Sequence, residues 1–399
     1  MANLSFNDCS TLLASINAQA TGRRGITPTN AAEFVSVAQT TLQTGYDNLI
    51  GAISIVLSRT IFAVRPYNRK FAGLAANEIR YGNHVRKLSV VDSDPAKDQR
   101  QELEDGKSVD MQTVKKPTIV QTNFYSANTY QRHITLFKDQ LDVAFSSPDE
   151  FAAFVAMVVQ TVSDEIEKDH ENCARFTLAN FIGGKLALSK LQPASDLDNY
   201  ASKSGVVHLV TEYNAKTGSD LTAETVRKPE NFARFMKFVM ARIRTISELM
   251  TERSTMFHIS PGGKAISRHT PLNKQKVYLH APDVHDMEAS VFSGVYHDEY
   301  LKKVDFETVN FWQSINEPTN VNITASYMGF NGVLANAAIN ESNVFGVIFD
   351  EEALGYTVVN QWSAPAPFNA AGGYTNVYHH FTDRYWNDFT ENGVVLLLD

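Results

Sequence analysis

One stretch of this sequence combines side chains that could do chemistry. It is the run His297-Asp298-Glu299, an imidazole followed by two carboxylates. Such groups can bind a metal ion or exchange protons with a substrate. The similarity to such sites is one of composition alone, and we expect no metal there. The run from Gly262 to Lys264 lacks the further glycine and the hydroxyl residue that a phosphate-binding loop requires.

The other histidines do not complete a catalytic spacing. His379 and His380 are adjacent, so in a strand they would point to opposite faces. His280 and His285 flank Pro282, which interrupts the helix that could bring them together. The sequence contains no GxGxxG, GxSxG or HExxH motif. We therefore predict no catalytic residue, no cofactor and no metal site, and a protein that is not an enzyme.

Composition narrows the function classes further. The chain has 399 residues, of which 43% are hydrophobic and 20% charged, as in ordinary soluble proteins with two or three cores. Its net charge of −8 argues against a large cationic surface for nucleic acid or anionic lipid. Cys9 and Cys173 are too far apart for a CxxC motif, which favours a reducing compartment. We predict no signal peptide and no membrane span.

The longest predicted element is a helix over residues 147–182. Ser147 can cap its N-terminus, and Glu150 stands at the capping-box position. Gly183-Gly184 is expected to end it. At 1.5 Å per residue the helix is about 50 Å long, so we interpret it as a strut, with the carboxylates from Asp164 to Glu171 on a solvated face. The apolar stripe consists of Phe151, Phe154, Val155, Val158, Val162, Ile166, Cys173 and Phe176.

Before this helix the residue composition and its pattern change twice along the chain. Residues 1–27 are small and polar, and we predict an extended arm. Residues 28–46 carry an apolar stripe at helical spacing and are predicted to be helical. Residues 59–130 contain short β-branched and aromatic runs, with strand-like alternation over 108–113 and almost no apolar residue over 92–107. This predicts a long β-hairpin with a charged tip, or alternatively a mobile loop; a lone hairpin is marginal in water, so we expect it to lie against something.

After the long helix, the clearest signals are a second helix and two buried strands. The second helix is predicted to begin at Pro229, and its apolar residues over 232–250 are predicted to face the core. Its basic residues are interpreted as a solvated or subunit-facing surface. Residues 344–349 and 394–398 are continuous apolar runs, typical of buried strands. Residues 350–355 are predicted to form one helical turn closed by glycine.

The order of these parts resembles the major capsid protein of tailed double-stranded DNA bacteriophages, which has the Hong Kong 97-type fold. Residues 343–355, with the sequence NVFGVIFDEEALG, are similar to the segment with which many phage capsid chains re-enter the peripheral domain. Residues 374–395 resemble the closing peripheral strands. The similarity covers essentially the whole chain and is greatest to capsid proteins of short-tailed and crAss-like phages.

The resemblance implies an α+β chain in five parts. Residues 1–58 would be an N-terminal arm and 59–130 an extended β-hairpin loop. Residues 131–190 would hold the long spine helix of the peripheral domain. Residues 191–342 would form the axial domain, and 343–399 the C-terminal strands of the peripheral domain.

The resemblance also implies a function and a set of partners. Copies of the chain would assemble as hexamers and pentamers into an icosahedral head that encloses double-stranded DNA without sequence-specific binding. A scaffolding protein and a portal would take part in assembly, no membrane would be involved, and the head would form in the cytoplasm of the host bacterium. The sequence shows no obvious N-terminal scaffolding extension, so we expect scaffolding to come from a separate protein.

The resemblance carries over no catalytic residue, but a hairpin laid on a neighbouring copy would bring its charged tip into inter-subunit contact. Two alternatives remain: an α/β hydrolytic or metal-dependent enzyme that uses the run at 297–299, and another virion structural protein such as a portal or a decoration protein. The predicted contact residues are Asp94, Lys97, Asp98, Arg100, Glu102, Glu104, Asp105 and Lys107.

Overall fold

The computed structural model describes residues 5–45, 48–49, 51–53, 56, 71–75, 85–93, 98–109, 112, 114, 116–125, 127–191, 205–291 and 306–399. The chain forms two compact units, and helix α5 (Pro148–Lys190) contributes residues to both. Unit 1 comprises Met1–Tyr81, Ala127–Cys173 and Thr357–Arg384; unit 2 comprises Gly82–Ser126, Ala174–Tyr356 and Tyr385–Asp399. Residues 343–399 thus supply strands to both units.

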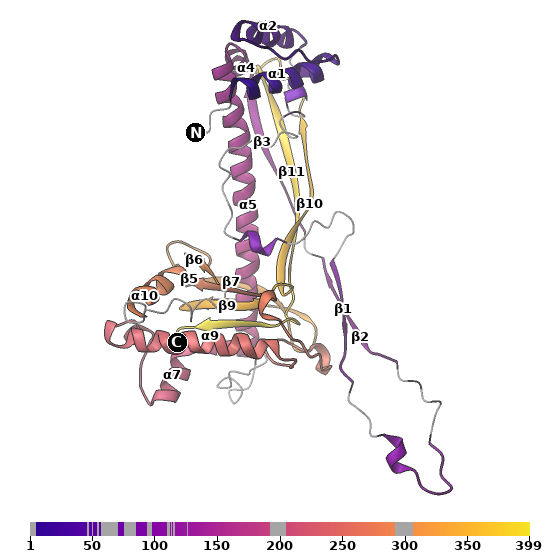
Figure 1. Ribbon diagram of the computed structural model, residues 1–399, viewed down its shortest axis with the longest axis vertical. Helices are drawn as coiled ribbons and strands as arrows, with labels where there is room; N and C mark the ends of the chain where they lie inside the picture. The colour runs from indigo at the N-terminus through magenta and orange to yellow at the C-terminus, as the bar shows by residue number, and fades with distance from the viewer. Residues whose placement is uncertain are drawn as a thin grey trace. The chain divides into compact units, whose positions relative to one another are not determined.

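Unit 1 combines helices with a three-stranded sheet of order β10-β11-β3 (Figure 1). Strand β11 pairs antiparallel with β3 from Tyr374 opposite Phe137 to Asp383 opposite Asn128. The elements of this unit, besides the first part of α5, are α1 (Phe6–Thr21), α2 (Ala31–Leu42), the 3₁₀ turn η1 (Ala72–Leu74), β3 (Asn128–Phe137), α4 (Lys138–Ala144) and most of β10 (Leu354–Pro365) and of β11 (Tyr374–Asn387).

Helix α1 replaces most of the predicted extended arm. Ser5 and Asp8 form a capping box at its N-terminus. Leu13 and Ile16 are fully buried in a cluster with residues of α2, so burial of this stripe outweighs the polar composition of the segment. The prediction of an extended arm is wrong over Phe6–Thr21. The predicted helix over 28–46 is confirmed as α2.

Helix α5 begins as predicted but ends later. The Glu150 N–H donates to the Ser147 hydroxyl oxygen (3.2 Å), and the helix continues through Gly183 and Gly184 to Lys190, 43 residues in all. The predicted glycine stop is wrong, because the missing side chains serve packing. A Cβ at Gly183 would lie 2.9 Å from the Ala325 side chain, and one at Gly184 would lie 2.3 Å from the ring of Phe389.

Two further interpretations of α5 need correction. Phe176, assigned to the buried stripe, is 61% exposed. The carboxylates are not simply solvated, because Arg132 of β3 donates to Asp169 (Nε–Oδ2, 2.5 Å) and to Glu165 (3.1 Å), and Glu171 is buried. These ion pairs join the helix to the sheet of unit 1.

Unit 2 is built on a five-stranded sheet of order β4-β12-β9-β5-β6. Its core unites the apolar face of α9 with the strands, for example Phe235 and Val239 with Ile348 and Leu396. The predicted second helix and the predicted buried strands are confirmed as α9, β9 and β12. The elements are β4 (Val206–His208), α7 (Leu209–Thr217), α8 (Ala223–Val226), α9 (Pro229–Thr251), η3 (Pro261–Gly263), η4 (Leu272–Lys274), β5 (Gln275–His280), α10 (Ala281–Val291), β6 (Glu307–Val309), β9 (Val344–Asp350) and β12 (Gly393–Leu397).

The predicted helical turn over 350–355 is wrong. The Ala353 N–H donates to the carbonyl oxygen of Asp350 (2.8 Å), which closes a β-turn, and Leu354 already belongs to β10. Strands β9 and β10 are thus joined by a tight turn.

One basic residue of α9 also differs from its prediction. Arg242, predicted to lie outside the apolar stripe of α9, is buried and donates to Glu212 (2.6 Å).

Unit 2 also carries two separate two-stranded ribbons. In one, β1 (Val85–Val90) pairs antiparallel with β2 (Ile119–Phe124), as the hairpin prediction requires. Between these strands lies the 3₁₀ turn η2 (Gln99–Glu102). The predicted strand over 108–113 is wrong at its described positions, which have no strand structure. In the other ribbon, β7 (Val321–Met328) pairs antiparallel with β8 (Leu334–Glu341).

Candidate assembly surface

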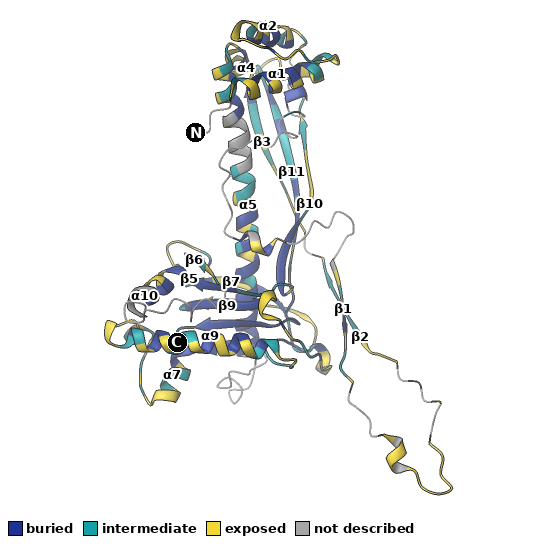
Figure 2. Cartoon of the chain, viewed as in Figure 1, coloured by how far each residue is buried: buried dark blue, intermediate teal, exposed yellow. Residues whose placement is uncertain are grey.

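Along strand β1, buried or partly buried residues alternate with exposed ones (Figure 2). Ser89 is buried and Lys87 is partly buried, whereas Leu88 is 57% and Val90 62% exposed. Val90 lies opposite Ile119 of β2, which is 55% exposed. Because residues two apart and residues directly opposite share a face of an antiparallel pair, the three apolar side chains form one exposed surface.

The inward face of β1 is held by charges. Lys87 Nζ donates to Asp388 (2.8 Å) and to Glu391, both between β11 and β12. Arg268 forms an ion pair with Glu391 (3.0 Å) and donates to the Ser89 hydroxyl oxygen (2.6 Å). Ion pairs and hydrogen bonds therefore fix the foot of the ribbon to the rest of unit 2.

The electrostatics of this foot keep Lys87 charged. Burial alone would lower the pKa of Lys87, but the carboxylates of Asp388 and Glu391 outweigh it and raise that pKa. Burial raises the pKa of Glu391, against the attraction of Lys87 and Arg268, which lowers it. The lysine thus remains a cation across the neutral range and can hold the strand there.

A second anchor follows at the end of β1. The Asp92 N–H donates to the carbonyl oxygen of Ala265 (2.9 Å), and Arg253 donates to the Asp92 carboxylate (2.5 Å). Hydrogen bonds from Ser267 and Arg253 lower the pKa of Asp92. This anchor fixes Asp92, just after β1, to the loop at 265–267 and to Arg253.

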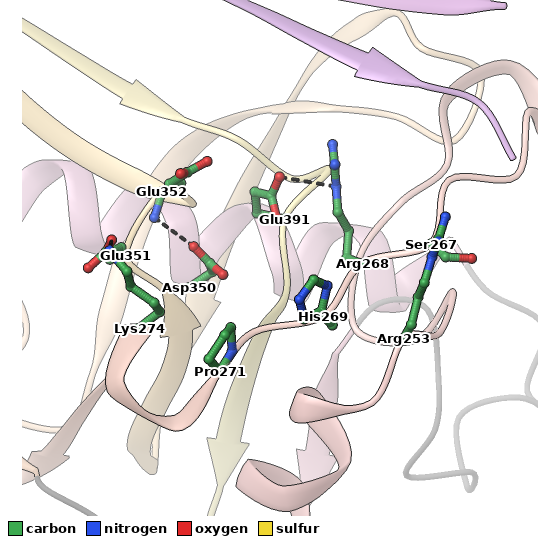
Figure 3. A pocket seen from close by; sticks show the side chains of 10 residues that line it. All are labelled: Arg253, Ser267, Arg268, His269, Pro271, Lys274, Asp350, Glu351, Glu352 and Glu391. Carbon is green, nitrogen blue, oxygen red and sulfur yellow. Dashed lines mark hydrogen bonds and ion pairs between the residues drawn. The ribbon is translucent and has the colours of Figure 1, made fainter. Parts of the chain in front are cut away.

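A pocket of ≈ 440 Å³ lies at these anchors (Figure 3). Most of its charges are already paired: Lys274 with Glu351, and Arg268 with Glu391. The pocket is a junction of loops joined by ion pairs, and we assign it no catalytic role. It is lined by Arg253, Ser267, Arg268, His269, Pro271, Lys274, Asp350, Glu351, Glu352 and Glu391.

The predicted contact residues at the tip form pairs within their own segment. Arg100 donates to Asp98 (Nε–Oδ2, 2.9 Å), and Lys107 donates to Glu104. Arg100, Glu104 and Lys107 are largely exposed. Exposed pairs of this kind add little stability to one chain, and their role in contacts between subunits stays a prediction.

The other predicted tip residues are less fully placed. Asp105 is exposed and precedes Gly106, whose φ of 83° suits a turn. Glu102 is the last residue of η2. Asp94 and Lys97 lie outside the described residues.

The histidines predicted not to form a site are dispersed. His379 contacts the Ser363 hydroxyl (2.6 Å) and His380 stacks on Trp362 (4.0 Å between ring centres), in line with opposite faces of β11. His280 ends β5 and contacts Asp283 of α10 (2.6 Å). The prediction that Pro282 interrupts a helix is wrong, because Pro282 lies in the first turn of α10, where a proline is tolerated.

The part of the chain that the structure describes contains no cluster of metal ligands and no membrane-spanning helix. The run His297-Asp298-Glu299 falls outside it. Within it, no three His, Cys, Asp or Glu side chains are grouped so as to hold a metal ion. Within it, too, no helix has the length and apolar character that a membrane crossing demands.

Comparison with solved structures identifies the fold. This chain is similar to a chain in the capsid structure of Staphylococcus phage Andhra, with 10% sequence identity, a TM-score of 0.51, and coverage of 86% of this chain and 87% of that one. It is similar to a chain in the structure of the head fiber and inner core protein gp22 of native bacteriophage P68, with 10% identity, a TM-score of 0.50 and the same coverage. No curated protein matches the sequence.

The likeness to these structures supports the Hong Kong 97-type fold predicted from the order of the parts. A sequence model of one family matches residues 13–397, almost the whole chain. This protein therefore belongs to the family of Phi29-like phage major capsid proteins.

Proposed function

We propose that copies of this capsid protein assemble as hexamers and pentamers into the icosahedral head of a tailed bacteriophage, with its double-stranded DNA inside. Family membership makes the chain a self-assembling structural protein of the virion. The hexamers, the pentamers and the enclosed DNA are the proposal.

The observation that carries the proposal is the outward apolar face of the β1–β2 ribbon. Leu88, Val90 and Ile119 are each more than half exposed, on a ribbon with only two strands. A two-stranded ribbon is marginal in water and needs a hydrophobic face covered. Since the face of β1 with Lys87 and Ser89 already contacts the rest of unit 2, a neighbouring subunit is the natural cover for the face with Leu88 and Val90.

We propose the following division of labour within the chain. Residues 1–58, with α1 and α2, act as the N-terminal arm, and 59–130 act as the extended loop. Residues 131–190 and 343–399 form the peripheral domain, and 191–342 the axial domain, whose copies meet at capsomer centres. A net charge of −8 suits a wall around DNA, because an acidic surface does not grip phosphates.

Assembly in the proposed scheme takes place in the cytoplasm of the host bacterium and needs two helpers. A separate scaffolding protein sets the curvature of the shell, and a portal occupies one vertex. The chain itself is expected to enclose the DNA without sequence-specific binding.

The first test is co-expression with neighbouring genes, followed by sucrose-gradient fractionation and negative-stain microscopy. Closed shells tens of nanometres across are the expected result. Small discrete oligomers alone, even with a scaffolding candidate present, would contradict the proposal.

The tip contacts are tested by charge reversal. Lys97, Arg100 and Lys107 changed together to Glu are expected to block shells while leaving the far-ultraviolet circular dichroism of the free protein unchanged. A matched control changes the exposed Lys216, Lys228 and Lys264 to Glu, with the same change in net charge. Normal shells from the tip variant would refute the tip contact, and failure of both variants would point to net charge instead.

A further inference from the structure

The β7–β8 ribbon packs one face on its own chain and leaves the other free. Alternate residues of β7, including Ile323 and Ala325, are buried. They come so close to α5 that a Cβ at Gly183 would lie 2.9 Å from both of their side chains. The ribbon therefore has a fixed seat in unit 2.

The outer edge of β7 is closed by two side-chain amides. Asn322 donates its N–H to Oε1 of Gln313 and accepts from Nε2 of the same amide, both at 2.8 Å. Ser326 makes the same pair of bonds with Asn180 of α5, at 2.8 and 3.0 Å. Each amide imitates one residue of a neighbouring strand, so a further strand cannot pair there.

These bonds fix the direction of the backbone groups in β8. Asn322 and Ser326 point their N–H and C=O groups away from β8, so their partners Asn340 and Asn336 point theirs away from β7. Ala338 lies between these two and points the same way. In an antiparallel pair, residues of the non-hydrogen-bonded type recur at every second position.

The edge of β8, in contrast, is open. Asn336, Ala338 and Asn340 are exposed. Within the described ranges, the outward backbone groups of these three residues make no hydrogen bond. No lysine, proline or bulge protects this edge, although proteins usually protect a free edge in one of these ways.

The free face of the ribbon is also uncharged, in a chain in which 20% of residues are charged. Glu341, at the end of β8, is turned toward Lys190 of α5 (3.9 Å). Copies of a chain with a net charge of −8 repel one another, so contact between copies costs least at an uncharged surface. The residues of the free face are Asn322, Thr324, Ser326, Met328, Leu334, Asn336, Ala338 and Asn340.

We propose that the open edge of β8 pairs, backbone to backbone, with a strand of a second copy of this chain. The neutral face admits another copy, and the closed edge of β7 leaves β8 as the side on which the ribbon can grow. This inference rests on the proposed assembly function and adds a specific contact to it.

Two adjacent alanines give a matched pair of variants. Ala338→Pro removes an N–H that points outward, so the free protein should keep the thermal midpoint of the wild type while the yield of shells falls at least tenfold. Ala337→Pro removes an N–H that points toward β7, so the free protein itself should melt at a lower temperature. Normal shells from a folded Ala338→Pro variant would overturn the proposal.

Residue-level hydrogen–deuterium exchange on the wild type decides the matter even if a proline variant fails to fold. In the free protein, the amides of 336, 338 and 340 should exchange quickly, and those of 335, 337 and 339 slowly. In shells obtained by co-expression with the scaffolding protein and then freed of it, all six should be slow. Shells in which 336, 338 and 340 stay fast, or slow only after another protein is added, would overturn the inference and leave the proposed function standing. A chain that forms no shells even with a scaffolding candidate present would overturn both.

Discussion

The two ribbons of unit 2 share one architecture but bury opposite kinds of side chain. Both are antiparallel pairs of two strands. In β7, Ile323 and Ala325 are buried against α5, and the polar residues face outward. In β1, Lys87 and Ser89 lie inward, while Leu88 is exposed. The same alternation of polar and apolar residues thus buries the apolar side chains of β7 within the chain and exposes those of β1.

This difference in burial indicates which ribbon stabilises the free protein and which one stabilises the assembled shell. A ribbon that buries its apolar face on its own chain is stabilised before any partner arrives. A ribbon that exposes its apolar face gains that stabilisation only when another chain covers it. We therefore expect substitutions in β7–β8 packing to change the free protein, and substitutions on the outer face of β1–β2 to change assembly.

The largest effects on the free protein are expected at the seat of β7, where Gly184 of α5 and Ile323 of β7 are packed. Gly184→Ala would place a Cβ 2.3 Å from the buried ring of Phe389, and we expect a loss of about 2–3 kcal/mol in the free energy of unfolding. The matched control is Gly51→Ala, since a Cβ at this helical glycine has nothing within 4 Å. Urea titration of the unassembled protein measures both, and equal stability of the two variants would remove the packing argument.

The next effect is expected at the foot of β1. Lys87→Met leaves the carboxylates of Asp388 and Glu391 buried with one cation fewer, and we expect a loss of about 2 kcal/mol. The control is Arg100→Met, whose partner Asp98 stands in an exposed pair, and no measurable change is expected there. If Lys87→Met unfolds at the same urea concentration as the wild type, the foot of the ribbon is not held by this cluster.

The pH dependence of stability distinguishes the contribution of Lys87 from that of Lys185, a second lysine of unit 2. Lys185 of α5 is fully buried, donates to the carbonyl oxygen of Phe257 (2.8 Å), and has its pKa lowered by burial from 10.5 to about 7. Between these values the unfolded chain binds a proton that the folded chain does not, so stability rises with pH. The raised pKa of Lys87 acts in the opposite sense and only above its unfolded value of 10.5.

The expected result is a difference between wild type and Lys185→Met. From pH 7.5 to 9.5, the unfolding free energy of the wild type should rise by about 2 kcal/mol more than that of the variant. Urea titrations across this range provide the measurement. Parallel pH curves for the two proteins would show that Lys185 stays protonated in the folded state.

The smallest effect on the free protein is expected on the outer face of the β1–β2 ribbon. Leu88, Val90 and Ile119 changed together to Ser should alter the unfolding free energy by less than about 0.5 kcal/mol and yet abolish shells. Ile323→Ala, on the buried face of β7, is the contrast, with an expected loss of about 2–4 kcal/mol. Sedimentation and urea titration decide between the two. A destabilised triple variant would mean that the outer face is covered within the chain.

Patterns within one element were readable from the sequence. Ser147 and Glu150 mark the start of α5 correctly, because capping depends on neighbours along the chain. The apolar spacing after Pro229 gave the buried face of α9. The apolar run of β9 gave a fully buried strand. Each of these signals depends on a few consecutive residues.

Signals that depend on distant residues were misread. Gly183 and Gly184 look like a helix stop, and only the approach of Ala325 and Phe389 shows why the helix continues through them. The same limit applies to the ribbon surfaces. The alternation of Lys87 with Leu88 was visible in the sequence, but which of them faces inward depends on Asp388, 301 residues away.

The sequence by itself determined the long helix, the hairpin, the buried strands and their order along the chain, because these follow from local propensity and periodicity. The capsid fold followed from the resemblance of that order to a known family. The tertiary structure decided which face of each ribbon is covered, where α5 ends and which strand edge stays open. These depend on contacts between residues far apart in the chain, such as the Asn180 amide that closes the edge of β7 at Ser326. A periodic pattern gives two faces to a strand, and only a packed neighbour makes one of them the inside.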